Sequence, residues 1–154
     1  MTDTKEAWLK MADWCARQER CLYDVEQKLK ALQIEETEKH CIIKKLSEEN
    51  YVDDARYVKF YVQDKFRFNG WGKIKIQWQL SQKKVASTTI ASALDDIDEE
   101  TYENKLRDIL NNKLKTIKGK DLWQTKAALL RFAQSRGFEY DLSNRLINQI
   151  TQRS

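Results

Sequence analysis

Hydrophobic residues recur at intervals of three and four along much of the chain, which is the spacing of one face of an α-helix. In the stretch 20–32 they stand at positions 22, 25, 29 and 32, and in the stretch 139–152 at positions 142, 146 and 150. We therefore expect an all-α protein. The predicted helices lie near residues 4–17, 20–32, 35–48, 53–67, 72–83, 86–97, 99–116, 120–135 and 139–152.

The predicted helices form three groups of three, because one turn recurs after the middle helix of each group. At each turn the middle helix ends. An apolar residue then follows five positions after the last core residue of that helix, and its side chain can pack against the core. The pairs are Leu29 and Ile34, Leu80 and Val85, and Ala133 and Phe138. Such repetition predicts three tandem three-helix units, residues 1–50, 51–98 and 99–154, stacked into an elongated curved array.

Several helix ends and faces can be assigned from single residues. Asp53 is expected to cap the helix that follows it, since its carboxylate can accept from the free amides of the first turn. Gly119 and Gly137 suit the left-handed position that often follows a helix. In the middle of the chain, the expected core faces consist of Ala55, Val58, Val62 and Phe66, and of Ile76 and Leu80 with Ile74 or Trp78 at the edge.

Composition supports a helical chain and shows where charge is concentrated. Proline is absent and only four glycines occur among 154 residues, and both residue types interrupt helices. The net charge is +4. Residues 65–84 hold six basic and no acidic residues, residues 95–103 six acidic and no basic ones, and residues 105–136 nine basic and two acidic ones. Such blocks suit an anionic partner or a partner with its own charge pattern, and a solvated surface is the alternative interpretation.

No arrangement of residues indicates a metal site, a cofactor or catalysis, so we expect a protein that is not an enzyme. Cys15, Cys21 and Cys41 lack zinc-ligand spacing, and the chain has one histidine. We expect these cysteines to be reduced and partly buried. Asp53 and Asp54 are adjacent at a helix start, where neighbouring side chains do not face each other. Signal-peptide and membrane-span patterns are absent, which predicts a soluble cytoplasmic protein that does not contact a membrane.

The candidate partner-binding or DNA-binding residues are the basic side chains of two stretches and one tryptophan. The first stretch surrounds the break Gly70-Trp71-Gly72 between two predicted helices. A row of cations there can contact DNA phosphates or an acidic protein surface. The whole set comprises Lys65, Arg67, Trp71, Lys73, Lys75, Lys83, Lys84, Lys113, Lys115, Lys118, Lys120, Lys126, Arg131 and Arg136.

The aromatic residues allow two interpretations, a base-stacking contact or a packing role. We expect Phe66 and Trp78 in the core. Phe68 and Trp71 lie at the break between helices, where an exposed contact is the alternative. The tryptophans of other amphipathic helices are expected to pack with one edge in water, and they are Trp8, Trp14 and Trp123.

The segment from Gln79 to Ile90 supports a rival hypothesis, a helix-turn-helix that binds DNA without another protein. Its second helix would present Ser87, Thr88, Thr89 and Ser92 to the bases. That helix offers no Arg, Lys, Asn or Gln, which are the usual side chains for reading base edges. A helical-repeat scaffold for some other protein is a further alternative.

Four segments resemble the RecX family of regulatory proteins, in order and over nearly the whole chain. Residues 51–58, Tyr-Val-Asp-Asp-Ala-Arg-Tyr-Val, are similar to the family's Leu-Asp-Asp-x-Arg-Phe-Ala opening, and residues 70–85 follow its Gly…Arg-Ile-x-x-Glu-Leu-x-x-Lys-Gly-Ile pattern. Residues 20–29 resemble its first-unit Arg-Ser-x-x-Glu-Leu-x-x-x-Leu, and residues 136–138 its Arg-Gly-Phe. This chain departs from the pattern at Cys21, Gln79 and Lys84, where the family has Ser, Glu and Gly.

The resemblance implies a fold and a function. RecX proteins consist of three tandem three-helix units. They bind the RecA filament on single-stranded DNA and inhibit its ATPase, strand-exchange and coprotease activities, which modulates DNA repair, recombination and the SOS response. On this resemblance we expect a RecA filament and single-stranded DNA as partners, the DNA contact being weak and electrostatic, and a monomeric protein.

Overall fold

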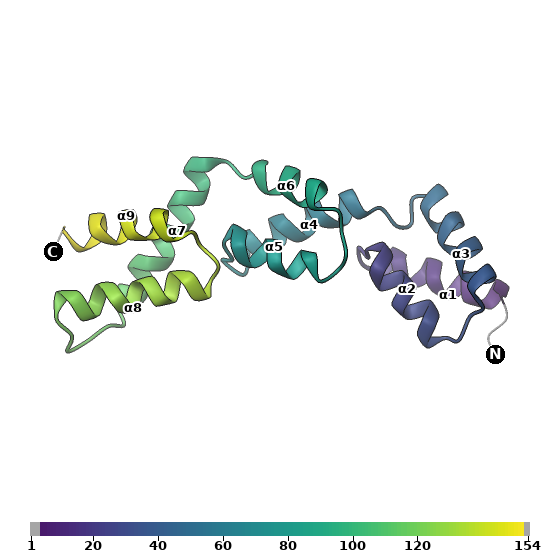
Figure 1. Ribbon diagram of the computed structural model, residues 1–154, viewed down its shortest axis with the longest axis horizontal. Helices are drawn as coiled ribbons and strands as arrows, with labels where there is room; N and C mark the ends of the chain where they lie inside the picture. Colours follow the sequence, from purple (N-terminus) through teal and green to yellow (C-terminus); the bar gives the residue numbers. More distant parts are fainter. Residues whose placement is uncertain (1–3, 153–154) are drawn as a thin grey trace. The chain divides into compact units, whose positions relative to one another are not determined.

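The computed structural model describes residues 4–152, and within that range the chain forms nine α-helices and no strand (Figure 1). The all-α prediction is therefore confirmed, and the predicted helix ends lie within a few residues of the observed ones. The helices are α1 (Thr4–Arg17), α2 (Leu22–Ala31), α3 (Glu36–Glu48), α4 (Asp54–Arg67), α5 (Lys73–Ser81), α6 (Ser87–Asp95), α7 (Glu99–Leu114), α8 (Leu122–Ser135) and α9 (Tyr140–Thr151).

The helices belong to two compact units. Unit 1 comprises Met1–Tyr61 and Leu80–Ile90, and unit 2 comprises Val62–Gln79 and Ala91–Ser154. The division runs through the middle helices, so that α4, α5 and α6 each contribute residues to both units. The three unit boundaries expected from the sequence stay a prediction.

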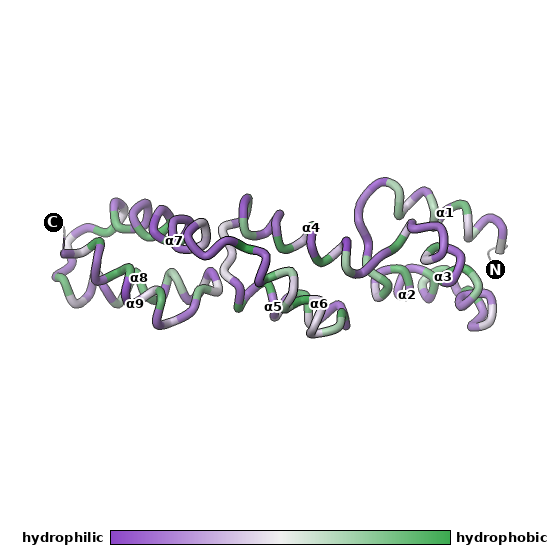
Figure 2. Tube along the Cα trace, turned by 90° about the horizontal axis from the view of Figure 1, so that it is seen from above, coloured by the Kyte–Doolittle hydropathy of each residue, from purple (hydrophilic) through white to green (hydrophobic). Residues whose placement is uncertain are grey.

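Unit 1 is organised around the apolar faces of its first three helices. Its core includes Met11, Val25, Leu29 and Leu46, all fully buried. Figure 2 shows the corresponding alternation of hydrophobic and hydrophilic positions along the helices. Burying four such side chains stabilises the unit by about 1.5–3 kcal/mol each.

Polar contacts in unit 1 link the start of α4 to the first turn of α2 and to the connection between α1 and α2. The Asp54 carboxylate accepts from the backbone N–H of Leu22 at 2.8 Å, so it serves the first turn of α2. The Arg56 guanidinium bonds the Glu19 carboxylate at 2.6 Å. Asp53 accepts from the backbone N–H of Arg56 at 3.2 Å, which confirms the predicted cap of α4. The two adjacent aspartates therefore cap two different helices.

Unit 2 contains a close approach between two backbone segments. The N–H of Gly72 donates to the carbonyl of Arg136 at 2.7 Å, and the N–H of Ile74 donates to the carbonyl of Gly137 at 3.0 Å. A β-carbon at Gly72 would lie 2.4 Å from the Gly137 oxygen. The start of α5 and the turn between α8 and α9 thus meet through peptide groups, and only glycine fits.

The turn predicted three times is observed three times. The residue before each returning apolar side chain has a positive φ, at Gln33 (60°), Lys84 (55°) and Gly137 (88°). Two of the three turns also share a hydrogen bond from the returning residue's N–H to the carbonyl five residues earlier, at 3.3 Å in the first and 3.1 Å in the third. The returning side chains Ile34, Val85 and Phe138 are all buried. The alignment of the three groups is confirmed at this turn.

Burial was predicted wrongly for four residues. In each case either the buried face of the helix or the position of its end differs from the prediction. Trp78 is 60% exposed and Trp123 is 77% exposed. The buried face of α5 carries Ile76 and Leu80, the buried face of α8 carries Leu129 and Ala133, and neither face includes the tryptophan. Ala55 is exposed, since it lies in the first turn of α4, before that helix enters the core. Cys41 is exposed, whereas Cys15 and Cys21 are buried as expected. Phe66 is buried, also as expected.

Candidate functional site

The break between α4 and α5 places two predicted cations beside its tryptophan. Gly70 has φ +66°, and the N–H of Trp71 donates to the carbonyl of Lys65 at 3.1 Å. The Nζ atoms of Lys65 and Lys75 lie 5.2 Å and 4.7 Å from the centre of the Trp71 ring. Ammonium groups at this distance are attracted to the face of an indole. Lys65 and Lys75 therefore lie together beside Trp71, and their role in binding a partner stays a prediction.

Lys73, at the start of α5, is held by a tyrosine that sequence reasoning did not single out. The backbone N–H of Lys73 donates to the Tyr102 hydroxyl at 2.9 Å, and that hydroxyl donates to the Glu139 carboxylate. Burial, followed by the hydrogen bond to Glu139, raises the pKa of Tyr102. The signal for Tyr102 was its position one turn before Leu106 on the buried face of α7.

Two further cations bind backbone carbonyl groups at the last residue of α4 and just beyond it. Lys105 donates to the carbonyl of Arg67 at 2.9 Å, and Arg136 donates to the carbonyl of Asn69 at 2.9 Å. Cations at a helix C-terminus complement its partial negative charge. Arg136, predicted as a binding residue, therefore also has a structural role.

The turn between α7 and α8 gathers four predicted cations around a pocket of about 560 Å³. Lys113 comes from the last turn of α7, Lys118 and Lys120 from the connection, and Arg131 from α8. Phe132 forms part of the wall, with the Lys113 Nζ atom 5.0 Å from its ring centre. We call these four cations and Phe132 the basic pocket. Lys115 and Lys126 do not line it.

The two predicted cations of the α5–α6 turn belong to unit 1 and to neither of the groups described above. Lys83 pairs with the Asp24 carboxylate at 2.7 Å, and this hydrogen bond raises the pKa of Lys83. The exposed Lys84 follows it with the positive φ of the turn, and both ammonium groups lie within 6 Å of the Tyr23 ring. Lys83 is thus an ion-pair partner that ties α2 to this turn.

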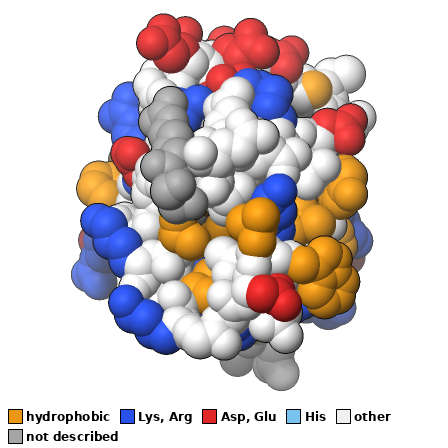
Figure 3. Space-filling view, turned by 90° about the vertical axis from the view of Figure 1, so that its left-hand side faces the viewer, with side chains coloured by type: hydrophobic (Ala, Val, Ile, Leu, Met, Phe, Trp, Pro, Cys, Tyr) orange, Lys and Arg blue, Asp and Glu red, His pale blue; other side chains and the backbone are white. Residues whose placement is uncertain are grey.

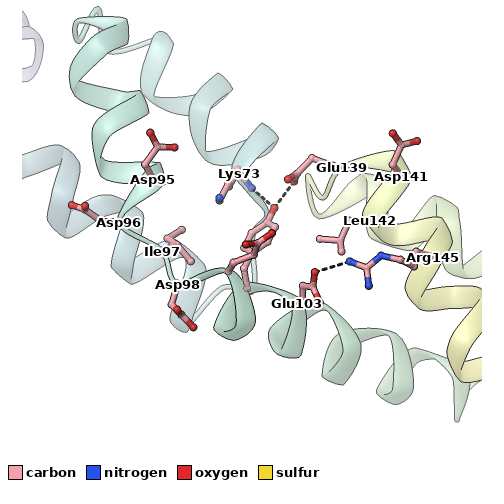
Figure 4. A pocket seen from close by; sticks show the side chains of 12 residues that line it. Lys73, Asp95, Asp96, Ile97, Asp98, Glu103, Glu139, Asp141, Leu142 and Arg145 are labelled. Atoms are coloured by element: carbon pink, nitrogen blue, oxygen red, sulfur yellow. Dashed lines mark hydrogen bonds and ion pairs between the residues drawn. The ribbon is translucent and has the colours of Figure 1, made fainter.

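An acidic pocket of about 860 Å³ occupies another part of unit 2 (Figure 4). Its carboxylates come from the end of α6, the start of α7 and the start of α9. Arg145 reaches into it and binds Glu103 at 2.6 Å, while the carboxylates of Asp95, Asp96 and Asp141 point away from this pair (Figure 4). The acidic block of the sequence is therefore extended by Glu139, which precedes α9, and by Asp141 in its first turn.

Figure 3 looks onto the side of unit 2 that carries α7, α8 and α9. Hydrophobic side chains gather across the middle of this face, Lys and Arg side chains lie around them, and acidic side chains gather at the upper edge. Within residues 4–152 no group of three or more His, Cys, Asp or Glu side chains is arranged to hold a metal ion. In the same range no helix is both long and apolar enough to cross a membrane.

The segment considered as a helix-turn-helix places its second helix at α6. Ser87, Thr88 and Ser92 are exposed there. Their short hydroxyl side chains can reach phosphate groups but offer no bidentate contact to a base edge. Nothing in this geometry favours sequence-specific binding.

Comparison with known families and relatives gives consistent results. Residues 53–94 match the model of the second three-helix domain of RecX, and residues 100–147 match the model of its third three-helix domain. The regulatory protein RecX of Vibrio parahaemolyticus serotype O3:K6 is 34% identical over 139 residues, which cover 90% of this chain and 85% of that protein. The regulatory protein RecX of Clostridium beijerinckii is 26% identical over 148 residues, covering 95% of this chain and 67% of that protein.

Other relatives are longer than the part that matches. The regulatory protein RecX of Clostridium perfringens strain 13 is 30% identical over 108 residues, and the matched part is 50% of its length. Among solved structures, RecX from Lactobacillus salivarius has a TM-score of 0.88 at 20% identity, covering 97% of both chains. A second crystal structure of regulatory protein RecX has a TM-score of 0.85 at 21% identity, covering 94% of this chain and 73% of the other.

The structural likeness supports the fold, and the sequence matches support the family. The matched relatives carry the name regulatory protein, which describes a regulator and not an enzyme. With two domain models matched in order and a relative 34% identical over most of both chains, this chain belongs to the RecX family.

Proposed function

We propose that this protein binds RecA filaments on single-stranded DNA and inhibits the ATPase, strand-exchange and coprotease activities of RecA. Such a protein modulates DNA repair, recombination and the SOS response. The observation that carries the proposal is the ordered match to two RecX domains over residues 53–94 and 100–147. The matched domains contain both groups of cations described above.

The two groups of cations support the proposal because they suit the two components of the filament. The cluster around Trp71 combines an indole, a side chain that is enriched at protein interfaces, with the ammonium groups of Lys65 and Lys75, which can face acidic side chains of a partner. The basic pocket carries Lys118 and Lys120 as exposed charges, which can neutralise phosphates of the bound strand.

The test is a titration of this protein into RecA from the same organism, assembled on single-stranded DNA with ATP. We expect the rate of ATP hydrolysis to fall as the protein approaches equimolar amounts. Cleavage of a LexA-type repressor should slow in the same titration. An unchanged hydrolysis rate at equimolar protein, with both proteins shown to be folded, would reject the proposal.

A heterologous RecA provides the matched control. Inhibition that depends on contacts between the two proteins should weaken with a distant RecA, whereas competition for bare DNA should not. Equal inhibition of the two RecA proteins would indicate competition for the DNA, and the filament proposal would then be wrong.

A further inference from the structure

We propose that a cavity of unit 1 binds an acidic peptide segment of another protein. The cavity has a volume of about 470 Å³ and lies between the end of α1 and one face of α2. We call it the Trp14 pocket, after the indole in its wall. Carboxylates of the bound segment pair with Arg20 and Lys28. Most of the lining precedes both segments that match the RecX domain models, so the family match does not imply this site.

Helical spacing determines the face of α2 that lines the pocket. Residues three and four positions apart lie on the same side of a helix. The lining residues of α2 follow this spacing, and they are Asp24, Gln27, Lys28 and Ala31. Ala31 is small and exposed, at the last position of α2. A segment from outside can therefore lie along this face without meeting a bulky side chain there.

Two cations beside the indole have no carboxylate partner within residues 4–152. The guanidinium carbon of Arg20 lies 4.0 Å from the centre of the Trp14 ring, and the Nζ atom of Lys28 lies 5.5 Å from it. Each of the nine ion pairs within residues 4–152 uses other cations. Cations that no acid neutralises attract an anionic partner.

The two acids in the lining of the pocket are already bound to other cations. The Glu19 carboxylate binds Arg56 at 2.6 Å, and the Asp24 carboxylate binds Lys83 at 2.7 Å. Both contacts are hydrogen-bonded ion pairs, the stronger kind of polar contact. The two cations beside the indole therefore stay available for carboxylates of a partner.

Arg20 is held in a position that suits a carboxylate. Its Nε atom donates to the backbone carbonyl of Trp14 at 3.4 Å, and its guanidinium packs on the indole of the same residue. Within residues 4–152 the two terminal nitrogens of this guanidinium donate no hydrogen bond. A guanidinium can bind a carboxylate through two parallel hydrogen bonds, and one that is already held in place loses less entropy when it does so.

The remaining polar groups of the lining favour a peptide over DNA. The side-chain amides of Gln18 and Gln27 offer both donors and acceptors, and the carboxylates of Glu19 and Asp24 offer acceptors. A peptide has a backbone N–H at almost every residue, from which these oxygens can accept. The backbone of DNA carries negative charge and acceptors only, so the two carboxylates repel it. This mixed lining therefore suits an acidic peptide.

The test is fluorescence anisotropy with the full chain, no RecA, and a labelled eight-residue peptide that alternates Asp and Gly. Arg20→Gln with Lys28→Gln should weaken binding about tenfold or more, because two charge-assisted contacts are lost. Arg20→Lys should weaken it about threefold, since the charge stays but the paired hydrogen bonds do not. Absence of saturable binding up to about 1 mM peptide would overturn the proposal.

The matched control changes the same two residue types at neighbouring positions, Arg17→Gln with Lys30→Gln. Neither residue lines the pocket, and the net charge of the two double variants is equal. The control should lower peptide affinity less than about threefold. Circular dichroism should show similar melting for both variants. Equal losses of affinity would overturn the proposal, because binding would then follow net charge alone.

Ala31 provides a second test that leaves both cations in place. Ala31→Lys should strengthen binding of the acidic peptide about threefold, and Ala31→Glu should weaken it by a similar factor, because each adds one charge at the end of the pocket. This position is exposed at the end of a helix, so both changes are compatible with folding. Equal peptide affinities of these two variants would contradict the assigned site.

A labelled oligothymidylate distinguishes a peptide site from a nucleic-acid site. The variant Arg20→Gln with Lys28→Gln should bind this strand within about threefold of the unchanged protein. A loss of oligothymidylate affinity as large as the loss of peptide affinity would assign the pocket to nucleic acid and overturn the proposal. RecA is absent from all these assays, so failure of the Trp14 pocket leaves the proposed function intact.

Discussion

Two glycines of unit 2 share a left-handed backbone but differ in what surrounds them. Gly137 has φ +88°, and a β-carbon there would lie 2.2 Å from the β-carbon of Lys75. Gly119 has φ +67° and would meet nothing within 4 Å. Substitution of Gly119 therefore measures the destabilisation from a left-handed conformation alone, whereas substitution of Gly137 adds the destabilisation from a steric clash.

We expect Gly137→Ala to destabilise the protein by about 3–5 kcal/mol, since overpacking adds to the left-handed penalty. Gly119→Ala should cost only about 1 kcal/mol, because the conformational penalty acts alone and is offset in part by the unfolded chain. Urea unfolding followed by circular dichroism measures both. Similar losses for the two variants would show that the contact with Lys75 is not tight.

The three cysteines differ in exposure, which predicts their reactivity. Cys41 is exposed, whereas Cys15 and Cys21 are buried. Burial is the main cause of a raised pKa at both buried thiols. It raises the pKa of Cys15, and it raises the pKa of Cys21 to about 11. The reactive thiolate of these two is therefore scarce at neutral pH.

Titration of the native protein with Ellman's reagent at pH 8 should consequently show one fast thiol and two slow ones. Cys41→Ser should remove the fast phase, and urea should make the remaining two react quickly. Two fast thiols in the native protein would mean that one of the buried sites opens readily.

At the scale of elements, the recurring turn contains one residue that departs from the RecX pattern. Lys84 has φ 55° where the family pattern has glycine. A residue with a β-carbon in this left-handed conformation lowers the stability of the fold by roughly 1–2 kcal/mol. Glycine avoids that penalty, but its greater freedom in the unfolded chain lowers stability by roughly 0.5–1 kcal/mol. The turn therefore retains strain that glycine would relieve.

Lys84→Gly should raise the free energy of unfolding by up to about 1 kcal/mol. The urea midpoint should rise with an unchanged slope. Lys84→Ala is the control, because it also removes the ammonium group near Tyr23 but keeps the β-carbon. An equal gain from alanine would assign the effect to the lost charge.

The helix α5 buries one narrow face, and this decides which of its residues matter for stability. Leu80 is fully buried, whereas Leu9 of α1 is 58% exposed. Leu80→Ala should cost about 2–5 kcal/mol through lost burial and a cavity. Leu9→Ala, the same chemical change, should stay within about 0.5 kcal/mol. Thermal and urea unfolding of the two variants make the comparison, and equal losses would contradict the assigned face.

Periodicity predicted the helices and the recurring turn because both depend on residues close in sequence. It failed for Trp78, since α5 has only nine residues and apolar side chains on more than one face. The close approach of Gly72 to Gly137 was also missed, because it joins residues 65 positions apart (137 − 72) whose neighbours look like ordinary turn residues. Contacts of this kind leave no local pattern.

At the scale of the whole molecule, charge blocks predicted the candidate surfaces only in part. Lys65 and Lys75 lie beside Trp71, and four cations of the second block line one pocket, but that these residues bind a partner stays a prediction. The charge blocks could not show that Lys83 is paired with Asp24, which lies 59 residues earlier in the sequence. They also missed the contribution of Glu139 to the acidic pocket. Partners far apart in sequence decide which cations stay available.

Removal of the two charges at the start of α5 should separate partner binding from stability. Lys73→Gln with Lys75→Gln is preferable to a change to Glu, because Lys73 lies beside the acidic pocket. We expect weaker inhibition of RecA ATP hydrolysis, with helicity and melting temperature nearly unchanged. Lys5→Gln with Lys59→Gln is the control and should inhibit normally. A parallel loss of melting temperature and inhibition would assign the two lysines to the fold.

The contact between the start of α5 and the α8–α9 turn consists of peptide groups, with hydrogen bonds of 2.7 Å and 3.0 Å. Peptide groups are the same in every protein, so a contact made by them depends little on which side chains surround it. Relatives can therefore exchange most surrounding residues and keep the same geometry, provided that both facing positions remain glycine. The likeness to a solved structure at 20% identity, with a TM-score of 0.88, is what such tolerance would produce.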